Sequence, residues 1–305
     1  MDDLKQFTIE SPLPPLWMMY PEIHRYSIGW RMGYGEGYKD RFYDWFDTLS
    51  SKERMQYQQL FPAPVFWGRY YDMFENEDTV EEDSELTYAY QDYCIEFWRK
   101  KGVPKYSLEG IQSRYKQGEV LKYSFFWGHQ PAKDGSLTQS CLSQWWMAEF
   151  RDFIYCNTYC CMEQYMMAEK ARLFGDEDIL QQILACKSPK AIKALGRKVR
   201  NFASSVWDDV KHSIILTGSW NKFTQDDSLR KFFSETKDVL VEASPYDSIW
   251  GIKMAADNID SKNPCKWKGQ NMLGFALMEV RDEIQMVYKN YDMIDWKKVK
   301  GFENE

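Results

Sequence analysis

A carboxylate and an amine stand at a spacing that suits catalysis in the segment MEQYMMAEKARLFGD, residues 162–176. Glu163 and Lys170 are two helical turns apart, so on a helix they share one face. Burying both charges on a face that also carries Met166 and Met167 costs free energy unless the groups are paired or used in a reaction. The pattern therefore indicates either a salt bridge on a core helix or an acid–base pair in an active site.

Two later clusters add charged groups, each with two interpretations. Arg197, in LGRKVRNF, has the planar guanidinium that binds phosphate through paired hydrogen bonds, and it equally suits the end of a helix. Asp247, in VEASPYDSIWG, is a second candidate carboxylate, but an aspartate after Pro245 is also typical of a turn. Each residue by itself is compatible with an ordinary structural role.

The elements that must position these residues are mostly helices. Strand patterns are short and do not alternate with helices in a βαβ rhythm, which predicts a helix-rich α+β fold and not a doubly wound parallel sheet. Ser188 and Pro189 have the residue types of an N-cap and a first helical position. In chain order we expect a strand from residue 122, helices at 162–174, 188–198 and 206–215, a strand at 239–243 and an amphipathic helix at 271–289.

The first part of the chain is rich in aromatic residues and contains no motif with an assignable chemistry. A helix is expected to begin at Ser50, since a glutamate stands three residues later as in a capping box. The acidic run at 75–85 predicts an exposed loop, and residues 86–101 predict a further helix. We therefore expect a helical N-terminal extension at 1–118 and a second domain at 119–305.

Composition limits the classes of function. The net charge of -7 disfavours a protein that coats nucleic acid with its whole surface, although it is compatible with a local basic site. No run of about 18 apolar residues and no secretory signal are found, so we expect a cytoplasmic protein without a membrane partner. Aromatic residues make up 17% of the chain, which suits either core packing or stacking on bases and sugars. Only three histidines accompany the cluster of Cys156, Cys160 and Cys161, so no structural metal is expected.

Seven sequence blocks, in their order along the chain, resemble the NADAR, or YbiA-like, family. The resemblance covers about residues 123–284 and leaves the N-terminal extension outside. It implies a helix-rich YbiA-like domain with a small sheet, and an N-glycosidase that separates a ribose anomeric carbon from nitrogen. The blocks are LSQWW (142–146), MEQYMMAEKARLFGD (162–176), ALGRKVRNF (194–202), VWDDVKHSII (206–215), NKFTQD (221–226), LVEASPYDSIWGI (240–252) and QNMLGFALMEVRDE (270–283).

The resemblance also implies which residues act on the substrate. Glu163 and Asp247 would be the two catalytic carboxylates, because cleavage needs a proton donor near the leaving nitrogen and a carboxylate near the sugar. Lys170 would either contact a phosphate or trap the opened ribose as a Schiff base, and the second role is preferred. Tryptophans of the blocks would stack on a base or shield the sugar, with core packing as the equal alternative. The expected substrate-binding residues are Trp127, Ser143, Trp145, Tyr165, Arg197, Trp207, Lys222, Glu242, Trp250, Gly251 and Asn271.

The chain departs from the family pattern at two places. Members often carry histidine where this chain has Gln164, so a possible proton carrier next to Glu163 is missing. Many also have a glycine-rich turn where this chain has Lys253 and Met254. The second difference leaves the substrate preference open.

Three functions are compatible with the sequence. The leading hypothesis is removal of ADP-ribose from a modified guanine base in a nucleoside or nucleic acid, because the aromatic content and the extension suit a large substrate. The alternatives are hydrolysis of a ribosylaminopyrimidine phosphate of riboflavin biosynthesis and a non-enzymatic ADP-ribose or nucleotide sensor. The expected partner is thus ADP-ribose or a ribosyl phosphate, with ADP-ribosylated nucleic acid as a further one. No cofactor is expected, because neither redox chemistry nor phosphoryl transfer is involved.

Overall fold

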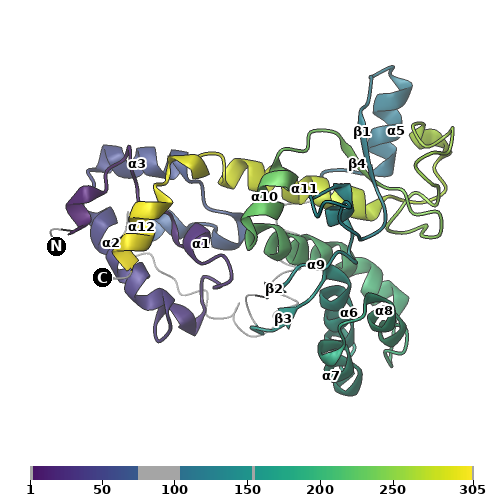
Figure 1. Ribbon diagram of the computed structural model, residues 1–305, viewed down its shortest axis with the longest axis horizontal. Helices are drawn as coiled ribbons and strands as arrows, with labels where there is room; N and C mark the ends of the chain where they lie inside the picture. Colours follow the sequence, from purple (N-terminus) through teal and green to yellow (C-terminus); the bar gives the residue numbers. More distant parts are fainter. Residues whose placement is uncertain (1–2, 75–103, 153–154, 304–305) are drawn as a thin grey trace. The chain divides into compact units, whose positions relative to one another are not determined.

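The chain forms two compact units, each with its own core (Figure 1). The computed structural model describes residues 3–74, 104–152 and 155–303. Of these, unit 1 contains residues 3–74, 155 and 283–303, and unit 2 contains residues 104–152 and 156–282.

Unit 1 consists of short helices around an aromatic core. In α2 (Gly35–Thr48), the buried residues Tyr38, Phe42 and Trp45 are four and three positions apart, so one face of the helix enters the core. Near the end of the chain, the Phe302 ring packs edge-on against Phe7, with 5.2 Å between ring centroids. The other elements of this unit are η1 (Asp3–Gln6), α1 (Leu16–Met19), η2 (Ile28–Trp30), α3 (Ser51–Leu60), η3 (Val65–Trp67), η4 (Tyr70–Phe74), η8 (Tyr291–Met293) and α12 (Trp296–Glu303).

The start of α3 confirms the predicted capping box. The Ser50 hydroxyl accepts a hydrogen bond from the Glu53 N–H, and the Glu53 carboxylate accepts one from the Ser50 N–H. The loop predicted at 75–85 and the helix predicted at 86–101 lie outside the described residues. The predicted domain boundary stays a prediction.

Two strands of unit 2 are parallel neighbours although they are far apart in sequence. β1 (Tyr123–Phe126) pairs with β4 (Val239–Glu242), and Phe126 lies opposite Glu242. Parallel strands have their carboxyl ends at the same edge of a sheet. Trp127, which follows β1, therefore lies at the same edge as Glu242.

Helix α6 (Met162–Leu173) lies among the other helices of unit 2, next to α7 (Glu177–Ala185) and α8 (Pro189–Gly196) (Figure 1). A Cβ atom at Gly196 would approach Met167 Sδ to 1.9 Å, and one at Gly218 would approach the Tyr165 ring to 2.4 Å. The two glycines therefore allow the neighbouring helices to lie directly on α6. Almost every side chain of α6 is buried, including Glu163. The helices packed against α6 are α7, α8 and α9 (Ser204–Thr224).

The predicted helix-rich α+β fold is confirmed. Among the described residues each sheet has two strands, while helices dominate both units. Helix α8 begins as predicted, with Ser188 as N-cap and Pro189 in the first helical position. No helix of the described residues combines the length and apolarity needed to cross a membrane. The remaining elements of unit 2 are α5 (Leu108–Lys116), η6 (Gln139–Leu142), β2 (Phe150–Arg151), β3 (Thr158–Tyr159), α10 (Asp227–Ser234) and η7 (Pro264–Lys266), and α11 (Met272–Val287) begins in unit 2.

Candidate active site

Glu163 is a buried carboxyl with an incomplete set of partners. It lies in the first turn of α6 and is 1% exposed. Its Oε2 accepts a hydrogen bond from the Trp145 indole N–H at 3.1 Å, whereas Oε1 is buried without a hydrogen-bond partner. Its backbone N–H donates to the Gln144 carbonyl at 2.9 Å. A buried, unsatisfied oxygen is rare in folded proteins, so Oε1 is a candidate contact for a bound substrate.

Charges from two other elements, α8 and the loop after β4, act on Glu163. Burial raises the pKa of its carboxyl, and the positive charge of Lys193 lowers that pKa most among the opposing influences. The Trp145 hydrogen bond and Arg197 also lower the pKa of Glu163, while Asp247 raises it. The fold thus brings α6, α8 and the loop after β4 together around one carboxyl.

Glu242, at the carboxyl end of β4, is a second acid of the site and is half-buried. Its Oε2 is buried and has no hydrogen-bond partner. Burial raises the pKa of Glu242 to about 8, with further upward contributions from Asp247 and Glu163 and a downward one from Lys193. At neutral pH this carboxyl is therefore mostly protonated and can donate a proton. Such perturbed acids are typical of active sites.

Asp247 is a turn residue, and its role as a catalytic carboxylate stays a prediction. Its Oδ1 accepts hydrogen bonds from the N–H groups of Ile249 and Trp250, at 2.9 and 2.8 Å, as a turn residue does. Its charge also raises the pKa of both Glu163 and Glu242. The turn therefore holds a carboxylate in fixed orientation beside these two acids.

Lys170 shares a face of α6 with Glu163, as predicted, but does not form an ion pair with it in the described structure. The Lys170 ammonium donates to the Gly196 carbonyl at 2.9 Å and lies 4.1 Å from the Phe202 ring centroid and 5.9 Å from that of Trp207. Burial lowers the pKa of Lys170, and the charge of Glu163 opposes this. A simple salt bridge on a core helix does not describe the pair.

Aromatic side chains lie at the exposed margin of the cluster. Trp127 is 56% exposed, and its ring centroid is 6.5 Å from that of Tyr246. The half-buried Trp145 ring lies 5.5 Å from the His129 ring and 5.7 Å from the Lys193 ammonium. These rings offer surfaces for a base or sugar.

Asn271 and Gly251 lie against the backbone of Glu242. Asn271 is fully buried, and its side chain accepts from the Glu242 N–H at 3.0 Å and donates to the Leu240 carbonyl at 2.9 Å. A Cβ at Gly251 would approach the Glu242 carbonyl to 2.7 Å. Their placement suits a positioning role, and the substrate contact expected from the sequence stays a prediction.

Four other expected substrate-binding residues range from buried to exposed. Tyr165 is 1% exposed and packs against aromatic rings of the core. Trp207 and Trp250 are half-buried, and the Trp250 N–H is held by Asp247. Arg197 is exposed at the end of α8, where a bound phosphate can reach it.

Lys193 is the main residue of the site that the sequence analysis missed. Its charge lowers the pKa of both Glu163 and Glu242, more than any other cation does. The available signal was its position four residues before Arg197, because residues at this spacing share one helix face. A second missed residue is Gln144. Its backbone carbonyl accepts the Glu163 N–H, and its buried side-chain Nε2 has no hydrogen-bond partner.

The two departures from the family pattern have structural explanations. The Gln164 amide donates to the carbonyls of Ile183 and Cys186 and accepts from the Cys160 N–H, so this side chain ties α6 to the end of α7. The Gln164 amide is therefore occupied by these backbone groups and is not placed for proton transfer. Lys253 has φ of +51°, in the left-handed region that glycine adopts most easily.

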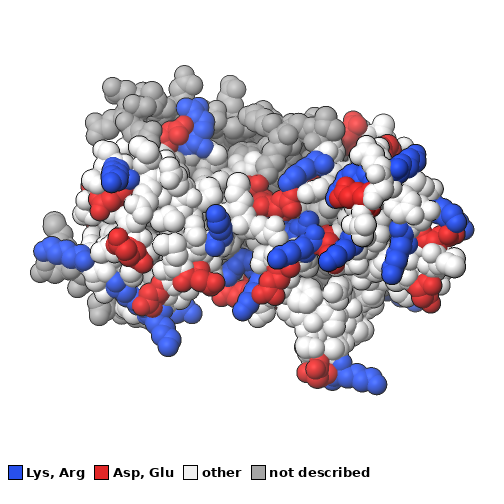
Figure 2. Space-filling model, turned by 90° about the horizontal axis from the view of Figure 1, so that it is seen from above, with Lys and Arg blue, Asp and Glu red and all other residues white. Residues whose placement is uncertain are grey.

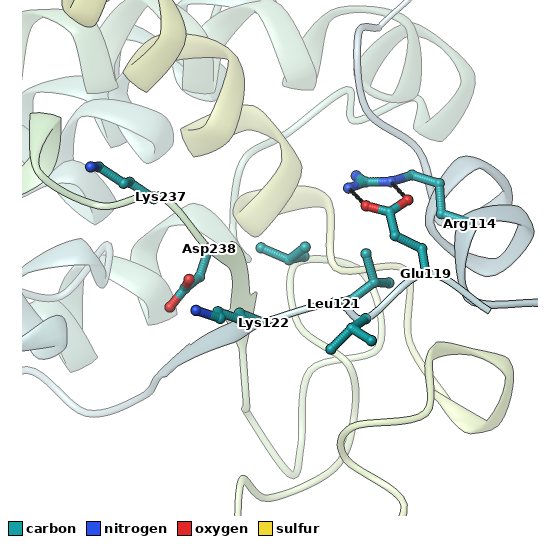
Figure 3. A pocket seen from close by; sticks show the side chains of 8 residues that line it. Arg114, Glu119, Leu121, Lys122, Lys237 and Asp238 are labelled. Atoms are coloured by element: carbon teal, nitrogen blue, oxygen red, sulfur yellow. Dashed lines mark hydrogen bonds and ion pairs between the residues drawn. The ribbon is translucent and has the colours of Figure 1, made fainter. Parts of the chain in front are cut away.

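A separate hollow of about 360 Å³ lies at the opposite ends of β1 and β4 (Figure 3). Its walls include Lys122 and Val239, which stand at the starts of these strands, and an ion pair between Arg114 and Glu119. None of its lining residues belongs to the carboxyl cluster. No group of three or more histidine, cysteine or acidic side chains among the described residues is arranged to hold a metal ion.

We expect Glu242→Gln to make the protein more stable than the wild type at pH 8 and little different at pH 5. Because the pKa of Glu242 is about 8 in the folded protein and near 4.5 when unfolded, the folded state alone keeps this proton between those values. The contribution of Glu242 to stability is therefore full below pH 4.5 and is lost as pH rises toward 8, by about 1.4 kcal/mol per pKa unit. Urea unfolding of both proteins at the two pH values measures the gap. The exposed Glu235→Gln is the control for removal of a charge, and an equal gap at both pH values would contradict the buried-acid interpretation.

The sequence matches the family model of the NADAR domain over residues 125–285. N-glycosidase R617 of Acanthamoeba polyphaga mimivirus is 40% identical over 171 residues, which cover 55% of this chain and 99% of R617. Protein irg-1 of Caenorhabditis elegans is 36% identical over 129 residues, 41% of this chain and 61% of irg-1. The NMR structure of YbiA from E. coli is similar over 54% of this chain and 86% of YbiA, with 23% identity and a TM-score of 0.44.

Proposed function

The chain belongs to the NADAR family, and from this premise we propose that it removes ADP-ribose from a modified guanine base by hydrolysing the bond between ribose C1 and nitrogen. Family membership supports the class of reaction, N-glycoside hydrolysis, since the relative R617 is named an N-glycosidase. The choice of substrate rests on the geometry of the site.

The observation that carries the proposal is the pair of acids with raised pKa, the buried Glu163 and the half-buried Glu242, beside Asp247. As the N-glycosidic bond breaks, positive charge develops on C1 and negative charge on the leaving nitrogen. We assign Glu163 as the general acid–base and Asp247 as the carboxylate that stabilises C1. Glu242, protonated at neutral pH, adds a donor for the leaving nitrogen. Acids whose environments give them different pKa values can take different roles at one pH.

Two separate aromatic surfaces favour a substrate with two bases. Trp127 and Tyr246 form one, and Phe202 with Trp207, beside Lys170, forms the other. ADP-ribosyl guanine carries adenine, guanine and a diphosphate. A ribosylaminopyrimidine phosphate has one ring and one phosphate, and would leave one surface without a partner.

Surface charge suits local recognition of a nucleic acid. On the face drawn in Figure 2, acidic and basic side chains are interspersed over the described residues. The cations assigned to the site, Lys170, Lys193 and Arg197, are instead gathered near the carboxyls of the site. A modified nucleotide would thus be bound at the site itself and not along an extended basic track.

The proposal is tested by incubating the purified full chain with ADP-ribosylated guanosine and, separately, with a ribosylaminopyrimidine phosphate. Chromatography should show free ADP-ribose from the first substrate and little ribose phosphate from the second, and Glu163→Gln serves as the inactive control. Release only from the second substrate would support the metabolic alternative. Release from neither, together with measurable ADP-ribose binding, would identify a sensor.

We expect Arg197→Ala to raise KM by a larger factor than it lowers kcat. A guanidinium that binds a phosphate away from the reacting bond holds the ground state and the transition state nearly alike, so its loss weakens binding uniformly. Steady-state kinetics separates the two constants. Arg200→Ala is the matched control, since Arg200 is three residues away and pairs with Asp176 and Asp178. A collapse of kcat at constant KM would move Arg197 into the catalytic set.

A further inference from the structure

Lys222, near the end of α9, has a buried ammonium that binds only backbone carbonyls. The side chain is 1% exposed, and its Nζ donates to the carbonyls of Cys141 and Ser143, at 2.5 and 3.1 Å. Among the described residues Lys222 forms no salt bridge, and these two carbonyls are its hydrogen-bond acceptors. Burial lowers the pKa of Lys222 to about 8, which reflects the cost of placing a charge there. The ammonium is enclosed by the protein, and the contact of Lys222 with a substrate stays a prediction.

The segment held by Lys222 leads directly to the residues that hold Glu163. Ser143 is followed by Gln144, whose carbonyl accepts the Glu163 N–H, and by Trp145, whose indole donates to Glu163 Oε2. The Ser143 hydroxyl also accepts the Trp145 N–H at 3.2 Å. The backbone of residues 141–145 therefore connects the hydrogen bonds of Lys222 on α9 with those of the candidate catalytic carboxyl.

Stability alone does not explain a lysine at this place. A buried charge is often replaced by a well-packed apolar residue without loss of stability, or with a gain. Methionine has a similar length and needs no hydrogen-bond donor. It would, however, leave the two carbonyls without the donor that fixes the direction of the segment.

We propose that Lys222 is a positioning residue for the N-glycosidase reaction, holding residues 141–145 so that Trp145 binds Glu163 Oε2 and leaves Oε1 free for the substrate. The proposal rests on the proposed function for its kinetic consequence. Its structural part, the control of the Trp145–Glu163 hydrogen bond by Lys222, can be measured without any substrate.

Lys222→Met is the direct test. A reacting group displaced by about 1 Å can lose about 10²-fold in rate, so we expect kcat to fall by about 10- to 100-fold while KM changes little. Because the Trp145 hydrogen bond lowers the pKa of Glu163, its loss should move the pH–rate limb of Glu163 upward. Trp145→Phe should move the same limb in the same direction, and the double variant should add nothing further.

Lys211→Met is the matched control, because Lys211 lies on the same helix, is 8% exposed and pairs with Asp208. It should leave the pH–rate limb in place even if stability falls. The substrate-free measurement is the indole N–H resonance of Trp145 in tryptophan labelled with ¹⁵N, assigned by its absence in Trp145→Phe. In Lys222→Met this resonance should lose the pH response that Glu163 imposes on it in the wild type.

The outcomes are distinguishable. An unchanged indole resonance and an unchanged pH–rate limb in folded Lys222→Met would overturn the proposal. Should that variant not fold, Lys222→Gln keeps a neutral donor and should give a smaller shift in the same direction, and failure of both variants to fold would assign Lys222 to the core alone. If the wild type hydrolyses neither substrate but Lys222→Met shows the expected indole change, the proposed function is refuted and the positioning of Trp145 and Glu163 by Lys222 stands.

Discussion

Glu163→Gln should lower kcat by about 10²–10⁴ while the protein stays folded. Glutamine keeps the shape of the side chain and can still accept the Trp145 hydrogen bond, but it cannot exchange a proton near neutral pH. Because the wild-type carboxyl is 1% exposed and burial raises its pKa, an amide is also less costly to bury at this site. The thermal midpoint should therefore be unchanged or higher. Kinetics and melting curves of the same preparation measure both quantities.

A purely structural Glu163 would behave differently. Removing one member of a buried ion pair strands the other charge and costs about 3–5 kcal/mol of stability. Activity would then follow the folded fraction, and the midpoint and the rate would fall together. Lower activity that recovers fully at a temperature where the variant is folded would refute the catalytic assignment.

Lys170→Ala should also lower turnover by at least about 10²-fold, and borohydride should trap a ribose adduct on the wild type. Burial lowers the pKa of Lys170, which increases the fraction of neutral amine able to attack C1. In that step the amine nitrogen bonds to C1, the C1–base bond breaks and the leaving nitrogen takes a proton. Ring opening then gives an imine that water hydrolyses. Borohydride adds hydride to the imine and leaves a stable amine, which intact-mass spectrometry detects.

Lys170→Arg is the control that separates charge from nucleophilicity. Arginine keeps a positive charge near the Gly196 carbonyl and the Phe202 ring but forms no such imine. We expect neither adduct nor turnover from it. Two results would contradict the Schiff-base role: activity of Lys170→Arg close to that of the wild type, or no adduct on active wild-type enzyme. Lys170 would then be a charge contact, and the carboxyls would catalyse the reaction without it.

Local structure was predictable because its causes lie within a few residues. The caps at Ser50 and Ser188 depend on side chains that reach N–H groups only three positions away. The helix expected at 162–174 is α6 (Met162–Leu173), and the strand expected at 239–243 is β4 (Val239–Glu242). Family membership was predictable for a related reason, since ordered blocks of sequence carry it without knowledge of their spatial contacts.

The charges of the site were predictable only as residue types. Glu163 and Asp247 were identified, but the raised pKa of Glu242 depends on burial at the end of a parallel strand pair. Lys193 acts on these acids because α8 packs on α6 through close contact at Gly196. Neither the burial nor the packing is a property of neighbouring residues in sequence.

By itself the sequence determined the helices, their caps, the helix-rich fold class and the family, because short-range hydrogen bonds and ordered motifs suffice for these. Tertiary structure alone decided which polar residues are buried, which are exposed and which groups they bind. Asn271 and Lys222 have residue types that suit a ligand, yet both are buried and bound to backbone groups far away in sequence. The physical reason is that the environment of a polar group, and so its charge and its partners, is set by segments that only folding brings together.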